Sequence, residues 1–136
     1  MIYEFEVPGK VIGKGRPRLN TYTGIVYTPT KTKDYETLIE QYFMIKYPRF
    51  KILEGRIKVS IIAYFSIPKS TSKTDIEKML KNNISPTKKP DIDNIVKIIL
   101  DSMNKFAFKD DIQITKLEVE KKYGEEDKVY IKIEEY

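Results

Sequence analysis

Residues 88–111, KKPDIDNIVKIILDSMNKFAFKDD, combine a helical core pattern with acidic residues near both ends. Pro90 fixes its own φ and favours an extended Lys89, so we expect the chain to enter Asp91 outside a helix and a helix to begin near Asp93. The apolar residues that follow recur at helical spacing and predict a buried stripe; they are Ile95, Val96, Ile99, Leu100 and Met103. Burial of this stripe would anchor the acids beside it.

The acids of this stretch are spaced so that they can meet. In an extended entry, residues two apart point the same way, so the carboxylates of Asp91 and Asp93 can converge. Lys97 follows Asp93 by one helical turn, and Asp110 and Asp111 come directly before an alternating strand. Three or four acids suit magnesium, because this ion prefers oxygen ligands and a pair of such ions can stabilise both the attacking and the leaving oxygen.

Each acid taken singly also has an ordinary structural interpretation. An Asp before an apolar helix is commonly an N-cap or a favourable charge at the positive helix end, and an Asp pair before a strand is common in turns. An EF-hand starting at Asp91 is excluded, because its sixth and twelfth positions are Val96 and Ser102 instead of Gly and Glu. A sugar-transfer Asp-x-Asp site is disfavoured, since no Gly-rich nucleotide fingerprint follows a strand. The combination of the acids with Lys97 favours a metal site.

Residues 89–94 read Lys-Pro-Asp-Ile-Asp-Asn and are followed by Lys97 and the pair Asp110-Asp111. This pattern resembles the signature of the RusA family of Holliday-junction resolvases. Two further runs are similar to prophage-type members of that family. They are Lys-Gly-Arg-Pro-Arg at 14–18 and Tyr-Thr-Pro at 27–29, the second of which leads to a helix. The resemblance covers most of the chain and is strongest in the acidic half.

The resemblance implies a RusA-like fold and a homodimeric, magnesium-dependent endonuclease, with manganese as a substitute. Such an enzyme cuts four-way DNA (Holliday) junctions by paired incisions in DNA recombination and repair. By matching positions, Asp91, Asp93 and Asp111 would be the metal-binding catalytic acids. Lys97 would be the catalytic lysine, stabilising negative charge or positioning the attacking water. Asp110 is the weaker ligand candidate of its pair.

Composition narrows the class of protein further. A chain of 136 residues with 40% hydrophobic content predicts one domain spanning 1–136. The absence of cysteine and histidine excludes imidazole-dependent triads and His- or Cys-bound zinc. No apolar run approaches a membrane span and the N-terminal residues lack signal-peptide character, so we expect a soluble, cytoplasmic protein without membrane partners.

The net charge of +5 is unevenly distributed, because residues 91–136 carry an acidic excess and the rest a basic one. Such an acidic centre in a basic protein suits a metal site that receives a polyanion. The Gly-rich loop at 10–18 and the polar segment at 68–90 are each either DNA-contacting elements or plain solvated connections. The cations proposed to contact branched DNA are Lys14, Arg16, Arg18, Lys73, Lys88 and Lys89.

The patterns along the chain predict an α+β domain, with a mixed or antiparallel sheet and helices packed on one face. The expected elements are strands at 2–7, 56–66 and 129–133, a hairpin turning at 22–24, helices at 30–47 and 74–81, and a strand from 112 with a bulge near Thr115. The strand at 56–66 is expected to be central, and Thr74 is expected to open a capping box.

Two other functions stay open on the sequence. The chain could be a non-catalytic basic DNA-binding module, in which the acids are caps and the lysines bind the DNA. It could also be a structure-selective magnesium nuclease for other branched DNA, such as flaps, or for duplex ends.

Overall fold

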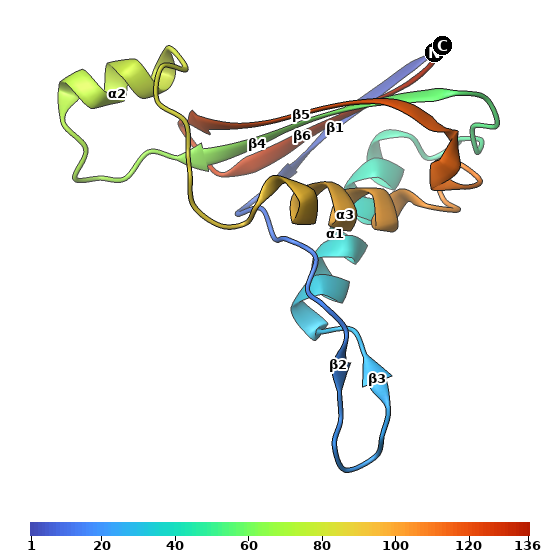
Figure 1. The fold of residues 1–136 in the computed structure, drawn as a ribbon. Helices are drawn as coiled ribbons and strands as arrows, with labels where there is room; N and C mark the ends of the chain where they lie inside the picture. Colours follow the sequence, from blue (N-terminus) through green and yellow to red (C-terminus); the bar gives the residue numbers. More distant parts are fainter.

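A mixed four-stranded sheet lies at the centre of the computed structural model, which describes residues 1–136 (Figure 1). Its strand order is β1-β6-β4-β5; the strands are β1 (Ile2–Pro8), β4 (Ile57–Ser66), β5 (Ile114–Gly124) and β6 (Lys128–Glu135). Strand β4 runs parallel to β5 and antiparallel to β6. The helices α1 (Thr30–Lys46) and α3 (Ile92–Met103) cover one face of the sheet. The predicted α+β class, with a mixed sheet and its two longest helices on one face, is confirmed.

Strand β4 is central because both of its faces are at least partly covered. Its alternate residues are buried under the helices and form the middle of one cluster of 21 buried apolar side chains; they are Ile57, Val59, Ile61, Ala63 and Phe65. Burial of each of the four larger side chains among them stabilises the fold by about 1.5–3 kcal/mol. A single cluster agrees with the single domain expected from chain length.

The buried face of α3 differs in part from the predicted stripe. The buried residues follow the i, i+3, i+4, i+7, i+8 pattern; they are Ile95, Ile98, Ile99, Ser102 and Met103. The predictions for Val96 and Leu100 were wrong in that both are only partly buried. The reason is that α3 packs against α1 as well as the sheet, which places Ile98 in the core.

Strand β5 begins later than predicted, at Ile114, because a short 3-10 helix, η1 (Asp111–Gln113), precedes it. The bulge predicted near Thr115 is confirmed: Ile57 pairs with Ile114 and Lys58 with Lys116, so Thr115 has no partner on β4. This bulge explains why the apolar alternation changes phase along β5.

Two elements lie away from the helical face. The hairpin of β2 (Arg18–Leu19) and β3 (Val26–Tyr27) projects from the body of the protein, and α2 (Lys73–Leu80) lies beyond one end of the sheet (Figure 1). The capping box predicted at Thr74 was wrong: α2 begins at Lys73, and the Ser72 hydroxyl accepts a hydrogen bond from the Asp75 amide at 3.2 Å. None of the helices combines the length and apolar character needed to cross a membrane.

Candidate active site

Asp91 occupies the N-cap position of α3, but its carboxylate does not cap the helix. The residue is extended, with φ −75° and ψ 159°, and makes no side-chain hydrogen bond to the helix backbone. Its Oδ1 instead accepts a hydrogen bond of 2.6 Å from Asn94 Nδ2. Asp93 follows in the first turn, and both acids are exposed. Asp91 therefore does not act as a side-chain cap of α3.

Asp110 and Asp111 differ in what their carboxylates do. Asp110 caps η1: its Oδ1 accepts a hydrogen bond from the Ile112 amide at 3.3 Å, and its own amide donates to Gln113 Oε1 at 3.0 Å. A hydrogen bond between the two carboxyls raises the pKa of Asp111 and lowers that of Asp110. Asp110 therefore has a structural role, whereas the Asp111 carboxyl does not cap η1.

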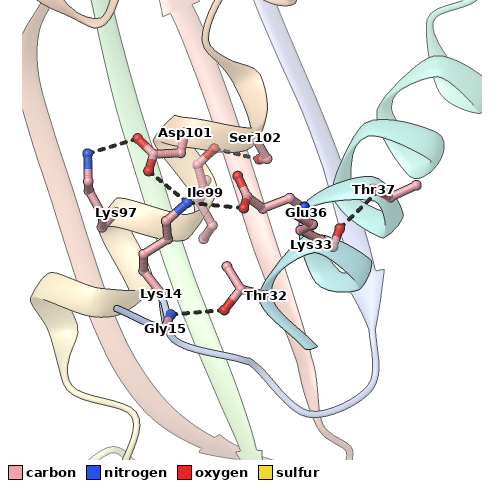
Figure 2. A network of polar contacts seen from close by, with 10 residues as sticks. All are labelled: Lys14, Gly15, Thr32, Lys33, Glu36, Thr37, Lys97, Ile99, Asp101 and Ser102. Carbon is pink, nitrogen blue, oxygen red and sulfur yellow. Dashed lines mark hydrogen bonds and ion pairs between the residues drawn. The ribbon is translucent and has the colours of Figure 1, made fainter. Parts of the chain in front are cut away.

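Lys97 belongs to a chain of ion pairs that crosses three elements (Figure 2). Its Nζ lies 3.0 Å from Asp101 Oδ1, one helical turn further along α3. The other Asp101 oxygen lies 3.1 Å from Lys14 Nζ, which also lies 3.1 Å from Glu36 Oε1 on α1. The N-terminal loop, α1 and α3 are thus joined beside Lys97.

Lys14 is the centre of this network and remains charged. Burial disfavours its ammonium, but hydrogen bonds with Glu36 and Asp101 and their negative charges outweigh that cost, so its pKa is raised. The side chains of all three residues are only about one-fifth exposed, at 18–22%. The Lys14 ammonium is therefore held by protein carboxylates, whereas Lys97, with 60% of its side chain exposed, faces solvent.

The basic N-terminal loop packs tightly against the start of α3. The Lys14 amide donates to the Asn94 carbonyl at 2.9 Å, and the Gly15 amide donates to Thr32 Oγ1 at 3.0 Å. A Cβ at Gly13 would lie 2.9 Å from Pro90 Cβ, a distance that real side chains do not adopt. Glycine at this position therefore allows the close approach that brings the loop beside Asp91.

A cavity of about 560 Å³ opens between this loop, the base of the hairpin and the start of α3. It brings together three cations proposed from the sequence, Lys14, Arg18 and Lys89, with Asp91. Its lining also includes Lys31, which was not proposed. The signal for Lys31 is present in the sequence, because no acidic residue occurs between Lys10 and Lys33. The cavity combines a carboxylate with cations that attract phosphate.

The other proposed DNA contacts lie outside this cavity. Arg16 is exposed on the loop just before the hairpin, and Lys73 is the first residue of α2, beyond the end of the sheet. Lys88 precedes α3, and its Nζ lies 5.8 Å from the centre of the Phe65 ring. The structure therefore gathers only half of the proposed cations around Asp91.

The donor chemistry of the site suits magnesium, although no three acidic side chains of the chain come close enough to hold one ion. Asp91, Asp93 and Asp111 supply exposed carboxylate oxygens. Magnesium keeps several waters and often uses only one or two protein carboxylates together with substrate phosphate. A site built on Asp91 with its neighbours, completed by water and phosphate, is therefore compatible with this arrangement.

Comparisons with known proteins agree with the resemblance seen in the sequence. A family model described as Endodeoxyribonuclease RusA matches residues 8–134. The uncharacterized protein YqaN of Bacillus subtilis (strain 168) is 35% identical over 136 residues, covering 97% of this chain and 95% of that protein. The matched residues include the hairpin, the cavity and every candidate acid. The chain therefore belongs to the RusA endodeoxyribonuclease family.

Proposed function

We propose that the protein is a magnesium-dependent endonuclease that resolves four-way DNA junctions in recombination and repair. The observation that carries this proposal is the carboxylate of Asp91, which leaves its helix uncapped and lies beside a cation-lined cavity. An exposed acid that does not cap its helix, next to groups that attract phosphate, suits a site where a metal and a DNA backbone meet. Membership of an endodeoxyribonuclease family supports the same conclusion.

The reaction is hydrolysis of a phosphodiester. A water oxygen forms a new bond to phosphorus, the bond from phosphorus to the leaving strand breaks, and a proton goes to the leaving oxygen. Asp91, Asp93 and Asp111 would hold magnesium, or manganese in its place, and the bound cation would supply positive charge at the phosphate. Lys97 would stabilise negative charge as it develops or position the water. Arg18, Lys31 and Lys89 of the cavity would hold the DNA backbone, since the Lys14 ammonium is held by two carboxylates.

A four-way junction has two strands to cut, which favours a homodimer with one site for each strand. A symmetric pair of subunits would also join two basic surfaces into a longer DNA footprint. The dimer would act in the cytoplasm, where a prophage-type enzyme of this family would meet recombining DNA.

The test compares cleavage with binding. We expect the wild-type protein to cut a synthetic four-way junction when magnesium is added, and Asp91→Asn to lose cleavage by at least ~100-fold while junction affinity changes little. Glu125→Gln, which removes an exposed acid between β5 and β6, serves as the matched control and should cut normally. A wild-type protein that binds junctions but never cuts them with magnesium or manganese would exclude the proposal.

A second candidate is a non-catalytic DNA-binding module, and it is favoured by the finding that no three carboxylates converge. In that case Asp91→Asn would have no effect on any DNA reaction, and the cavity cations would account for all binding. A nuclease for other branched DNA is distinguished by comparing the cutting of junctions, flaps and linear duplexes under the same conditions.

A further inference from the structure

The β2–β3 hairpin carries large exposed apolar side chains, and it projects away from the rest of the chain (Figure 1). Only two residue pairs form its ladder, and the Asn20 amide adds a bond of 2.9 Å to the Ile25 carbonyl. Its exposed apolar side chains are Leu19, Tyr22, Ile25, Val26 and Tyr27, and Tyr22 at the tip is 98% exposed. Apolar groups concentrated on a two-stranded ribbon usually indicate a binding element.

Both faces of this ribbon are apolar. Leu19 pairs with Val26, so these two side chains share one face. On the other face Arg18 pairs with Tyr27, and Ile25 lies on the same side as Tyr27 because it precedes it by two residues. A ribbon that packed onto a flat surface would need only one apolar face. Two apolar faces suit a ribbon that is inserted between two apolar surfaces.

The charge around the ribbon identifies the class of partner. No carboxylate occurs from residue 10 to residue 33, and this stretch carries six cations. Arg16 and Arg18 lie just before and at the start of one arm, and Lys31 and Lys33 follow the other. The hairpin of a second copy would carry the same positive charge and would be repelled. DNA carries negative charge and flat apolar base surfaces. It is therefore attracted both to the cations around the ribbon and to the apolar side chains on it.

The base of the hairpin leads into the candidate active site. Arg18 on β2 and Lys31, just after β3, line the same cavity as Lys89 and Asp91. A DNA strand held at the ribbon would therefore pass next to the acid that is proposed to hold the metal. A branch point in DNA exposes the faces of base pairs on both sides of an opening, and a two-stranded ribbon is narrow enough to enter a DNA groove.

We propose that the β2–β3 hairpin inserts into the branch point of junction DNA, where Tyr22 stacks on an exposed base and Arg16, Arg18, Lys31 and Lys33 contact the flanking phosphates. This proposal rests on the proposed function for its substrate, branched DNA. It adds that the hairpin, separate from the acids, distinguishes a junction from a linear duplex.

The test measures binding of the full-length protein to a synthetic four-way junction and to a linear duplex of the same sequence, without magnesium. Tyr22→Ala loses the stacking contact with one base, so its affinity for the junction should fall about 10-fold. Its affinity for the duplex should change less than about 2-fold. Tyr22→Phe keeps the ring and should bind as the wild type does. Ile45→Ala, which removes an exposed apolar side chain from α1, is the matched control and should have no effect.

A 2-aminopurine base at the branch point provides a second readout. Its fluorescence should change when the wild type or Tyr22→Phe binds, and not when Tyr22→Ala binds. The proposal is overturned if Tyr22→Ala binds junctions as tightly as the wild type. It is also overturned if Tyr22→Ala converts a dimer into monomers in light scattering, because the hairpin would then be a subunit contact.

The two proposals fail separately in these experiments. If the wild type cuts junctions with magnesium and Tyr22→Ala binds and cuts them equally well, the hairpin proposal alone is wrong. If the wild type never cuts but Tyr22→Ala still loses preference for junctions, the hairpin proposal stands and the proposed catalysis is wrong.

Discussion

The Lys14 ammonium lies 3.1 Å from the Asp101 carboxylate, although one residue is in the N-terminal loop and the other near the end of α3. Lys14 also holds Glu36, and Asp101 also holds Lys97. The position of the proposed catalytic lysine is thus coupled to the loop that lines the cavity. Lys14 is a positioning residue in this arrangement, because its own ammonium is occupied by the two carboxylates.

Replacing Lys14 by Met should lower the free energy of unfolding by about 1–2 kcal/mol, because two partly buried carboxylates would lose their shared cation. Urea denaturation measures this change. Adding Glu36→Gln to Lys14→Met should recover part of the loss, since Asp101 keeps its ion pair with Lys97 and the uncompensated charge of Glu36 is removed. Equal stability of wild type and Lys14→Met would show that the network contributes nothing to folding.

The same lysine predicts how stability depends on alkaline pH. Because the pKa of Lys14 is raised in the folded protein above its ordinary value of 10.5, its stabilisation is complete below that pH and is lost as the pH rises through the folded value. The difference in unfolding free energy between wild type and Lys14→Met should therefore shrink above pH 10.5. If this difference in unfolding free energy stayed constant as the pH rose well above 10.5, the pKa of Lys14 would not be raised by folding.

Asn94→Ala should raise the magnesium concentration needed for half-maximal cleavage by about 10-fold, because the amide that orients the Asp91 carboxylate is removed. Junction affinity without metal should not change. Magnesium titrations of the cleavage rate measure the effect, and Asn83→Ala in an exposed segment after α2 is the matched control. An unchanged magnesium requirement would mean that Asn94 does not orient a metal ligand.

Asp110→Asn and Asp111→Asn should have opposite consequences for activity. Asparagine caps a helix about as well as aspartate, so Asp110→Asn keeps the cap of η1 and should retain most of the cleavage activity. Asp111→Asn removes the proposed metal ligand and should lower cleavage by at least ~100-fold. Cleavage assays measure both effects, with thermal denaturation to show that each variant is folded. If Asp110→Asn lost cleavage and Asp111→Asn kept it, Asp110 would be the metal ligand and Asp111 would not.

Tyr35→Phe should stabilise the protein. The Tyr35 hydroxyl is buried without a hydrogen-bond partner, and burial also raises its pKa. Because an unsatisfied buried polar group costs about 1–3 kcal/mol, removing the oxygen should raise the unfolding free energy by about 1 kcal/mol. Thermal denaturation provides the measurement. A less stable variant would show that the hydroxyl has a partner in solution, such as a buried water.

Local patterns predicted the elements of the fold well. The change of phase between Ile114 and Leu117 predicted the bulge at Thr115, because a one-residue insertion moves every later side chain to the other face. The apolar character of both faces predicted that β4 is central. The start of α2 was misplaced because Ser72 and Thr74 can each cap a helix, and only the backbone decides which one does.

The candidate site was less accessible from the sequence. Asp91, Lys14, Arg18 and Lys89 were each proposed, but their grouping around one cavity depends on how the N-terminal loop packs on α3. The partners of Lys14 were missed because Glu36 is 22 residues away and Asp101 is on another helix. Contacts between such distant residues leave no periodic signal in the chain.

The position of β1 at the edge of the sheet has a consequence for how the molecule is made. Strand β1 forms its ladder only with β6, so the N-terminal strand has no partner until residues 128–135 have left the ribosome. Sheet closure therefore waits for β6, the last strand of the sheet to be synthesised. A chain interrupted before β6 would leave β1 without any partner and expose the edge of β4 that β6 covers, and such edges are prone to aggregation.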